Sequence, residues 1–279
     1  MDVRATLKVA AEIRKLTIGA MTAAGYGHIG GSMSICDMLA VLYTDILNID
    51  PTDPQKADRD WLVLSKGHCG PALYAALAWR GYFNKEMLKT LNANGTRLPS
   101  HCDRLKTPGV DISTGSLGQG LSLAAGVAFG NRQQGINNTV YAILGDGELQ
   151  EGQNWEAFQF IAHWHLNNVI TIVDNNKRQL DGYTKDLCNP YSLKEKFTAF
   201  GLNALEADGH DVQSIYDAIV EAKNSKTPTV VICNTEKGYG CNFSEIPDFN
   251  HYMIISEDMA NSAMEDIDMR LEKTYEALS

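Results

Sequence analysis

The sequence predicts an α/β fold: a doubly wound, mostly parallel sheet with helices on both faces. Five short apolar runs have the length of buried strands, and they alternate with segments in which apolar residues recur at helical spacing. Hydrophobic residues make up 44% of the 279 residues and charged residues 21%, which is a globular composition. No Pro/Ser-rich linker divides the chain, so we expect one domain over residues 1–279, with 252–279 as a candidate C-terminal helical appendage.

The predicted strands are near-continuous apolar runs without alternation between apolar and polar residues. This pattern is typical of parallel strands that are buried on both faces of a sheet. The five runs are residues 61–64, 140–144, 169–173, 202–207 and 230–232. The polar segments SKGH, GDG, DNN, DGH and CNTEKG follow them in that order. Because ligands of such sheets bind beyond the carboxyl ends of the strands, these segments are candidates for one shared site.

The predicted helices lie between and around the strands. Apolar side chains recur at helical spacing in residues 5–22, 34–47, 71–79, 117–129, 155–164, 212–222 and 257–278. Pro71 stands in a first helical turn, where its missing N–H has no bond to make. The segment 117–129 is rich in Gly, Ala and Ser, which suits a helix packed closely against a neighbour. Strands that alternate with helices in this way indicate the doubly wound arrangement.

Charge and composition exclude several classes of partner. The chain carries 24 Lys+Arg against 34 Asp+Glu, a formal charge of −10, and no Lys/Arg cluster, so it is a poor candidate for binding nucleic acid. We expect no membrane-spanning run of 18 apolar residues and no signal peptide, because charges interrupt the N-terminal apolar stretch. None of the six cysteines lies in a CxxC pair, which predicts reduced thiols and a cytoplasmic location.

The strongest chemical signal is a pair of polar segments after two successive strands. Gly145-Asp146-Gly147 follows one predicted strand, and Asn176 closes the DNN segment after the next. Asp146 and Asn176 are 30 positions apart, enough for strand end, helix and strand, so both side chains can emerge at adjacent strand ends. Carboxylate and amide oxygens suit Mg²⁺ or Ca²⁺, which completes its shell with phosphate oxygens and water. A complete GxGxxG, a P-loop and HExxH are all missing from the sequence.

These segments occur together with others that resemble one enzyme family. The GDG…DNN pair is similar to the metal–diphosphate motif of thiamine-diphosphate enzymes. The segments Gly27-His28-Ile29-Gly30, DRDWLVLSKGHCGPALYA (58–75), LPSHCD (98–103) and TGSLGQGL (114–121) resemble the N-terminal, diphosphate-binding half of transketolases. The resemblance runs from about residue 10 to residue 251 and implies the thiamine-diphosphate-binding fold.

The resemblance implies a cofactor, thiamine diphosphate, held through a divalent metal, Mg²⁺ or else Ca²⁺ or Mn²⁺. Asp146 and Asn176 match the side-chain metal ligands, and the backbone carbonyl of Arg178 matches the third protein ligand. Asn176 also matches a cofactor contact, and Gly147 matches a position that contacts the diphosphate.

Three further positions match cofactor contacts of the family. Gly115 and Leu117 in the TGSLGQG segment match residues that contact the aminopyrimidine ring. Glu151 matches a glutamate near both the cofactor and the subunit contact, and we include it among the candidate catalytic residues.

Four histidines match active-site positions of the family. His28, His68 and His101 lie in three of the segments that resemble transketolases, 27–30, 58–75 and 98–103. An imidazole can relay protons, or donate to hydroxyl and phosphate oxygens, near neutral pH. The resemblance implies that His68 also contacts the cofactor. His251 matches by distance from the KGYG segment, although Asn250 stands where similar small-subunit transketolases have Trp. The other histidines are interpreted as structural: His163, His165 and His210.

The family's catalytic glutamate and most of its sugar-phosphate contacts come from a second, pyrimidine-binding domain. The resemblance therefore implies a split transketolase, in which a separate C-terminal subunit completes the site, in an α₂β₂ heterotetramer. The implied reaction moves a two-carbon ketol unit from a ketose phosphate, such as a pentose phosphate, or a related ketose to an aldose. The sequence does not name the sugars.

Other interpretations stay open at this point. The chain could be another thiamine-diphosphate subunit, either of the 2-oxo acid dehydrogenase E1 type or similar to deoxyxylulose-phosphate synthase. His68-Cys69 and His101-Cys102 could instead form an N₂S₂ zinc set. A binding or regulatory module without catalytic activity is the third alternative.

Overall fold

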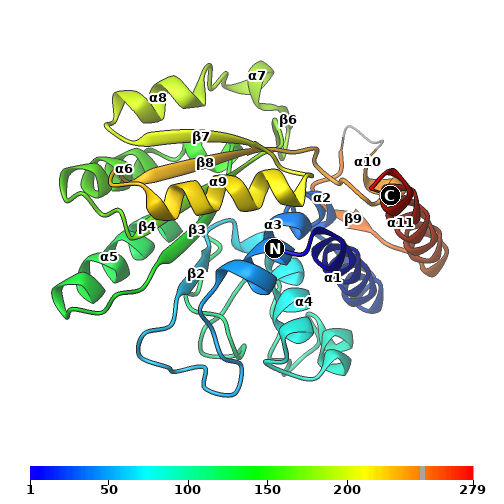
Figure 1. The fold of residues 1–279 in the computed structure, drawn as a ribbon. Helices are drawn as coiled ribbons and strands as arrows, with labels where there is room; N and C mark the ends of the chain where they lie inside the picture. Colours follow the sequence, from blue (N-terminus) through cyan, green and yellow to red (C-terminus); the bar gives the residue numbers. More distant parts are fainter. Residues whose placement is uncertain (246–248, 279) are drawn as a thin grey trace.

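The computed structural model describes residues 1–245 and 249–278. Its centre is a sheet of five parallel strands: β2 (Trp61–Leu64), β3 (Val140–Gly145), β4 (Val169–Asn175), β7 (Asn203–Asp208) and β8 (Thr229–Asn234). They lie side by side in the order β2-β3-β4-β8-β7 (Figure 1). All five predicted strands are present, and the α/β fold class is confirmed. The order of the strands is new information, because the sequence pattern does not specify it.

Helices cover both faces of this sheet (Figure 1). The core on one face of the sheet contains residues of α1 (Val3–Ala24), α3 (Cys36–Val41), α4 (Gly70–Arg80) and α9 (Val212–Asn224). The other face packs against α5 (Gln119–Gln133), α6 (Gly152–His163) and α8 (Leu193–Ala199). Successive residues of β3 therefore face different cores: Tyr141 and Ile143 join the first cluster, whereas Ala142 and Leu144 join the second. Burial on both faces is the reason why these strands are continuously apolar.

Short elements connect the larger ones. The short strands and helices are β1 (Tyr26–Gly27), α2 (Ile29–Met33), β5 (Arg178–Gln179), β6 (Gly182–Tyr183), α7 (Thr184–Leu187), α10 (Asn242–Glu245) and β9 (Met253–Ile254). Single turns of other helix types are η1 (Leu42–Ile46), η2 (Gly67–Cys69), η3 (Lys85–Thr90) and η4 (Gly147–Gln150). None of them has the length from which a hydrophobic period can be read.

Two predicted helices differ in detail from the observed ones. The segment 34–47 is not one α-helix, because α3 runs into a π-helical turn, in which the Leu47 N–H donates to the Leu42 carbonyl oxygen at 2.9 Å. The helix predicted from residue 117 starts two residues later, at Gln119. Gly118 has φ +86°, a left-handed conformation that the α-helix does not allow.

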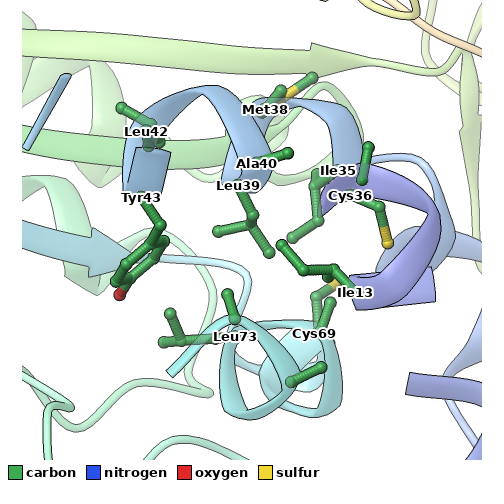
Figure 2. Packing of buried hydrophobic residues seen from close by; sticks show 14 of the residues in the cluster. Ile13, Ile35, Cys36, Met38, Leu39, Ala40, Leu42, Tyr43, Cys69 and Leu73 are labelled. Carbon is green, nitrogen blue, oxygen red and sulfur yellow. The ribbon is translucent and has the colours of Figure 1, made fainter. Parts of the chain in front are cut away.

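We predicted that no apolar run is long enough to span a membrane. By length and composition, this prediction is wrong. Residues 29–46 are long and apolar enough to cross a bilayer, but 89% of this stretch is buried inside the protein. Figure 2 shows Leu39 of this stretch pointing toward Ile13 of α1 and Leu73 of α4, whereas Met38 points to the opposite side of its helix. The stretch is apolar because it forms the centre of the larger core.

The C-terminal helix, α11 (Glu257–Ala277), lies along α1 (Figure 1). Ala263 and Ile267 are buried in the larger core. Lys15 and Asp268 form an ion pair at 2.5 Å, and the Tyr275 hydroxyl donates to the Arg4 carbonyl oxygen at 2.7 Å. These contacts place the helix against the first helix of the chain.

Candidate active site

The carboxyl ends of β2, β3, β4 and β8 meet at one edge of the sheet, next to a cavity of about 380 Å³. Every residue predicted for the site lines this cavity: His28, His68, His101, Gly115, Leu117, Asp146, Gly147, Glu151, Asn176, Arg178 and His251. They come from segments up to 223 positions apart, from His28 to His251. The structure thus collects them in one place, while their individual roles stay predictions.

Asp146 and Asn176 lie at neighbouring strand ends, because Gly145 of β3 is in register with Asp174 of β4. Asp146 Oδ1 accepts from the Gly147 N–H at 2.9 Å. Its Oδ2 is buried and has no hydrogen-bond partner in the described part of the chain, although the Lys177 N–H also favours the charged form. Burial and the nearby carboxylate of Asp174 raise the pKa of Asp146 to about 7. A buried carboxylate with an unused oxygen fits a cation.

Asp174 joins the strand ends beneath the cavity. Its Oδ2 accepts from Lys66 Nζ at 2.5 Å, and from Ser34 Oγ and Asn176 Nδ2 at 2.7 Å each. Its Oδ1 accepts from Thr235 Oγ1 at 2.5 Å. Although burial opposes the charged form, the Lys66 ammonium more than offsets it and lowers the pKa of Asp174. This network orients Asn176, whose own Oδ1 accepts from the Arg178 N–H at 3.1 Å.

The four predicted histidines form one cluster. The ring centroid of His28 lies 5.5 Å from that of His68, 5.7 Å from that of His101 and 5.3 Å from that of His251. Burial, together with nearby positive charge, lowers the pKa of His28 to about 4 and that of His251 to about 3. The pKa values of His68 and His101 are lowered by burial as well. The rings are therefore neutral at pH 7, and each can donate from one nitrogen and accept at the other.

A two-stranded antiparallel sheet brings His251 next to His28. In it, Gly27 of β1 pairs with Met253 of β9. Asn250, the residue at the departure from the family pattern, is buried and donates to the carbonyl oxygens of Lys237 and Ser244 at 2.8 and 2.7 Å. Its side chain thus anchors the segment that carries His251.

The loop before α5 forms another wall of the cavity. Gly118 is left-handed, and a Cβ atom there would lie 2.7 Å from the Cβ of Glu151, so only glycine allows this approach. Glu148 holds the loop, because its carboxylate accepts from Ser65 Oγ at 2.5 Å, from the Gly118 N–H at 3.0 Å and from the Gly145 N–H at 3.1 Å. Leu117 stays 37% exposed at the rim.

Three charged residues of the cavity were not among the predicted site residues. Lys66 and Lys237 bring positive charge to the strand ends, and Glu148 is the buried carboxylate that braces the loop. Both lysines stand in segments that directly follow predicted strands, Lys66 in SKGH and Lys237 in CNTEKG, so their position was the available signal. Lys237 Nζ lies 3.3 Å from His251 Nδ1 and donates to the Gln179 carbonyl oxygen at 3.2 Å. Burial and the charge of Lys66 lower its pKa to about 8.

Within residues 1–245 and 249–278, no group of three or more His, Cys, Asp or Glu side chains is arranged to hold a metal ion. The zinc interpretation through His68-Cys69 and His101-Cys102 therefore has no structural support. An oxygen set made of one carboxylate, one amide and one backbone carbonyl is a different kind of site. The cavity combines such a set with two lysines and neutral histidines, which suits an anionic ligand with a divalent cation.

Comparison with known proteins supports this interpretation of the cavity. The family model described as "Transketolase, thiamine diphosphate binding domain" matches residues 5–276. The chain is 47% identical, over 92% of its length and 94% of the relative's, to a 6-deoxy-6-sulfo-D-fructose transketolase subunit, SqwG, of Clostridium sp. strain MSTE9. It is 38% identical, over 91% of its length and 92% of the relative's, to an apulose-4-phosphate transketolase subunit of Actinobacillus succinogenes.

Solved structures agree with the sequence matches. The fold superposes on a crystal structure of transketolase from Campylobacter jejuni with a TM-score of 0.90 at 31% identity, covering 96% of this chain and 43% of that one. This chain thus spans less than half of that transketolase, whereas it spans nearly all of the two subunits named above. The chain therefore belongs to the transketolase family, as a subunit that carries the thiamine-diphosphate-binding domain.

Proposed function

We propose that this chain is the cofactor-binding half of a split transketolase that transfers a two-carbon ketol unit from a ketose with an anionic terminal group to an aldose. One observation carries the proposal: all eleven residues predicted from the family's motifs line one cavity of about 380 Å³. The cavity also contains Lys237, whose ammonium would oppose the charge of a diphosphate in a chain whose formal charge is −10.

The cavity residues fit a thiamine diphosphate–metal complex. Asp146 Oδ2, buried and without a partner in the described residues, would bind the divalent cation together with Asn176 Oδ1 and the Arg178 carbonyl oxygen. Lys237, His68 and the backbone at Gly147 would bind the diphosphate. When bound, thiamine diphosphate supplies an electron sink for cleavage of the bond next to the ketose carbonyl.

The histidine cluster would handle the sugar hydroxyls. Because the lowered pKa values keep His28 and His251 neutral at pH 7, each ring can donate a proton in a hydrogen bond to one hydroxyl while accepting at its other nitrogen. Lys237 lies beside His251 and disfavours its protonation. The cluster therefore orients a polyol and moves protons between its oxygens without adding charge to the site.

We further propose that a separate pyrimidine-binding subunit completes the site in an α₂β₂ assembly in the cytoplasm. Both relatives named above are described as subunits, and all six cysteines of this chain are free. The partner would supply the glutamate that activates the cofactor. It would close the cavity from the side where Leu117 and Glu151 form the rim.

The substrate class follows from the relatives and from the charge of the cavity. One relative is named for a sulfonated ketose and the other for a ketose phosphate. Both sugars end in a strong anion, so we propose a ketose sulfonate or phosphate as the donor. A pentose phosphate is a member of this class that the assay should include.

The test is an assay of ketol transfer by the chain alone, and by the chain with the product of a neighbouring transketolase-type reading frame. We expect activity only with the partner, and only with Mg²⁺ and thiamine diphosphate. Asp146→Asn should abolish it, whereas the matched control Asp53→Asn, at an exposed position, should retain it. Turnover of pyruvate but not of ketoses would instead favour the dehydrogenase-type or synthase-type alternative. Full activity of the chain alone would refute the split architecture.

A further inference from the structure

His210 lies outside the cavity but contacts both sides of the turn that carries Lys237. Its Nε2 atom accepts from the backbone N–H of Glu236 at 2.8 Å. Its ring stacks on Tyr239, with centroids 3.6 Å apart and planes 16° apart. The imidazole of His210 therefore contacts Glu236 with its edge and Tyr239 with its face, on the two sides of Lys237.

A buried acid fixes the orientation of this imidazole. His210 Nδ1 lies 3.0 Å from Oδ2 of Asp37, whose side chain is only 3% exposed. Both carboxylate oxygens of Asp37 also accept from the guanidinium of Arg14. Arg14 outweighs the burial and, with His210, keeps the pKa of Asp37 below its ordinary value, so Asp37 is an acceptor only. Nδ1 must then carry the proton, which leaves Nε2 free to accept from Glu236.

The turn has other tethers, but they hold it at other atoms. The Gly238 N–H donates to the Gly30 carbonyl oxygen at 3.0 Å, and Arg14 Nε donates to the Tyr239 carbonyl oxygen at 3.3 Å. Neither reaches Glu236, the residue directly before Lys237. Lys237 is also held through its carbonyl oxygen, which accepts from Asn250 Nδ2 at 2.8 Å, and Thr235, directly before the turn, donates its N–H to the Asn175 carbonyl oxygen at 3.3 Å and its hydroxyl to Asp174 at 2.5 Å. The bond from the Glu236 N–H to His210 adds a side-chain tether at the first residue of the turn.

We propose that His210 is a positioning residue: held by Asp37, it fixes the 236–239 turn so that the ammonium of Lys237 stays inside the cavity between His251 and the Gln179 carbonyl. His210 itself touches no ligand in this scheme. The sequence pattern alone assigns His210 to a merely structural position, and the proposal gives that position a specific effect on the site. Its consequence for the cofactor rests on the proposed function, since it assumes that Lys237 binds the diphosphate.

The pKa of Lys237 depends on whether its ammonium lies inside the cavity or in water. Inside the cavity, burial and the charge of Lys66 bring its pKa to about 8, whereas an exposed lysine has the ordinary value of 10.5. The other titratable groups that face it are His28, His68, Cys69, Asp146, Asp174 and His251. If the turn relaxes, the ammonium moves toward water and its pKa rises.

Two substitutions of His210 separate the hydrogen bond accepted by Nε2 from the presence of the ring itself. His210→Asn keeps a donor for Asp37 and loses the acceptor for Glu236, whereas His210→Gln places an amide oxygen where Nε2 lies. The matched control is His165→Asn, a histidine-to-asparagine change at an exposed position with a positive φ of 46° that asparagine tolerates. NMR of the lysine side-chain nitrogens of the full chain gives the titration midpoint of Lys237.

In the wild type we expect a midpoint near 8, and in His210→Asn a rise of about one unit or more toward 10.5. His210→Gln and His165→Asn should keep the wild-type midpoint. An unchanged midpoint in a folded His210→Asn variant, or an equal rise in His210→Gln, would overturn the proposal. If His210→Asn does not fold, the through-hydrogen-bond coupling between the Glu236 N–H and His210 Nε2 in the wild type decides: its presence supports the tether, and its absence overturns it.

A second measurement separates this inference from the proposed function. Thiamine diphosphate with Mg²⁺ is titrated into each variant, together with the partner subunit, and we expect about a tenfold weaker affinity for His210→Asn because a charge-assisted bond is lost. A shifted Lys237 midpoint with unchanged affinity would support the positioning role. It would at the same time refute the proposed contact between Lys237 and the diphosphate.

Discussion

The ion pair between Lys66 and Asp174 gives the sharpest test of how the site is built. Both side chains are buried, with 2% and 0% exposure, and they lie 2.5 Å apart. Lys66→Met leaves the Asp174 carboxylate buried without its cation, a change that typically costs about 3–5 kcal/mol. Three neutral donors to the Asp174 carboxylate remain: the hydroxyls of Ser34 and Thr235 and the amide of Asn176. Because they still stabilise the charge in part, we expect a loss at the lower end of this range, about 3 kcal/mol in the free energy of unfolding.

A double-mutant cycle measured by urea unfolding of the chain checks this value. Lys66→Met with Asp174→Asn buries no charge, so the double variant should be more stable than Lys66→Met alone, with a coupling of about 2 kcal/mol. The control, Lys226→Met at an exposed position, should change stability by less than about 0.5 kcal/mol. Additive effects within about 0.5 kcal/mol would refute the account of a coupled buried pair.

The pH dependence of the same variant has a definite sign. In the wild type the pKa of Asp174 is lowered, so the stability that it contributes is present above its ordinary value of 3.8 and is lost as the pH falls through its folded value. Without Lys66 the burial cost dominates and the folded pKa rises above 3.8. The deficit of Lys66→Met should therefore shrink as the pH falls from 7 toward 4, and a deficit independent of pH would contradict this reasoning.

Three further predictions concern the cavity and α5 beside it. Gly120→Ala should cost about 1–3 kcal/mol in thermal or urea unfolding, because its Cβ would lie 2.6 Å from the Cβ of Ser65; wild-type stability would contradict the close approach. His28 and His251, with pKa values of about 4 and about 3, should show no NMR titration between pH 5 and 8. The stability that depends on their neutral rings should fall only as the pH drops below 6.5, the ordinary value. A titration midpoint near 6.5 for either ring would refute its burial. Asp146→Asn should keep or raise the melting temperature, because it removes a buried carboxylate whose Oδ2 has no partner among the described residues. The same variant should lose Mg²⁺-dependent thiamine diphosphate binding in calorimetry, and a large loss of stability would show that the carboxylate serves the fold.

The fold could be predicted where a hydrophobic period is long enough to read. The five strands and the long helices α1, α4, α6, α9 and α11 appear within a few residues of their predicted positions. Strand order could not be predicted, because parallel strands buried on both faces have the same apolar pattern wherever they stand in the sheet. The pairing of β1 with β9 was also invisible, since two residues per strand carry no period.

The site shows a similar division between local and long-range information. Residues in glycine-containing segments after strands could be found, because the carboxyl ends of parallel strands meet at one edge. Asn250 illustrates the limit: its identity suggests only a departure from the family, yet its two bonds, to the carbonyl oxygens of Lys237 and Ser244, anchor the His251 segment. Those bonds depend on a tertiary placement that no local pattern encodes.

The two lysines of the cavity resolve how an acidic chain can hold a diphosphate. The pKa of Lys66 is raised above the ordinary value, because the attraction of the Asp174 carboxylate outweighs the burial cost. The charge of Lys66 is therefore balanced by Asp174 inside the protein. Lys237 has a histidine and a backbone carbonyl as its nearest partners, and its pKa is lowered to about 8. An anionic ligand would relieve that cost and raise the pKa of Lys237 again. Under the proposed function, this ammonium and the Asp146 oxygen that has no partner among the described residues would bind a metal diphosphate without a basic surface.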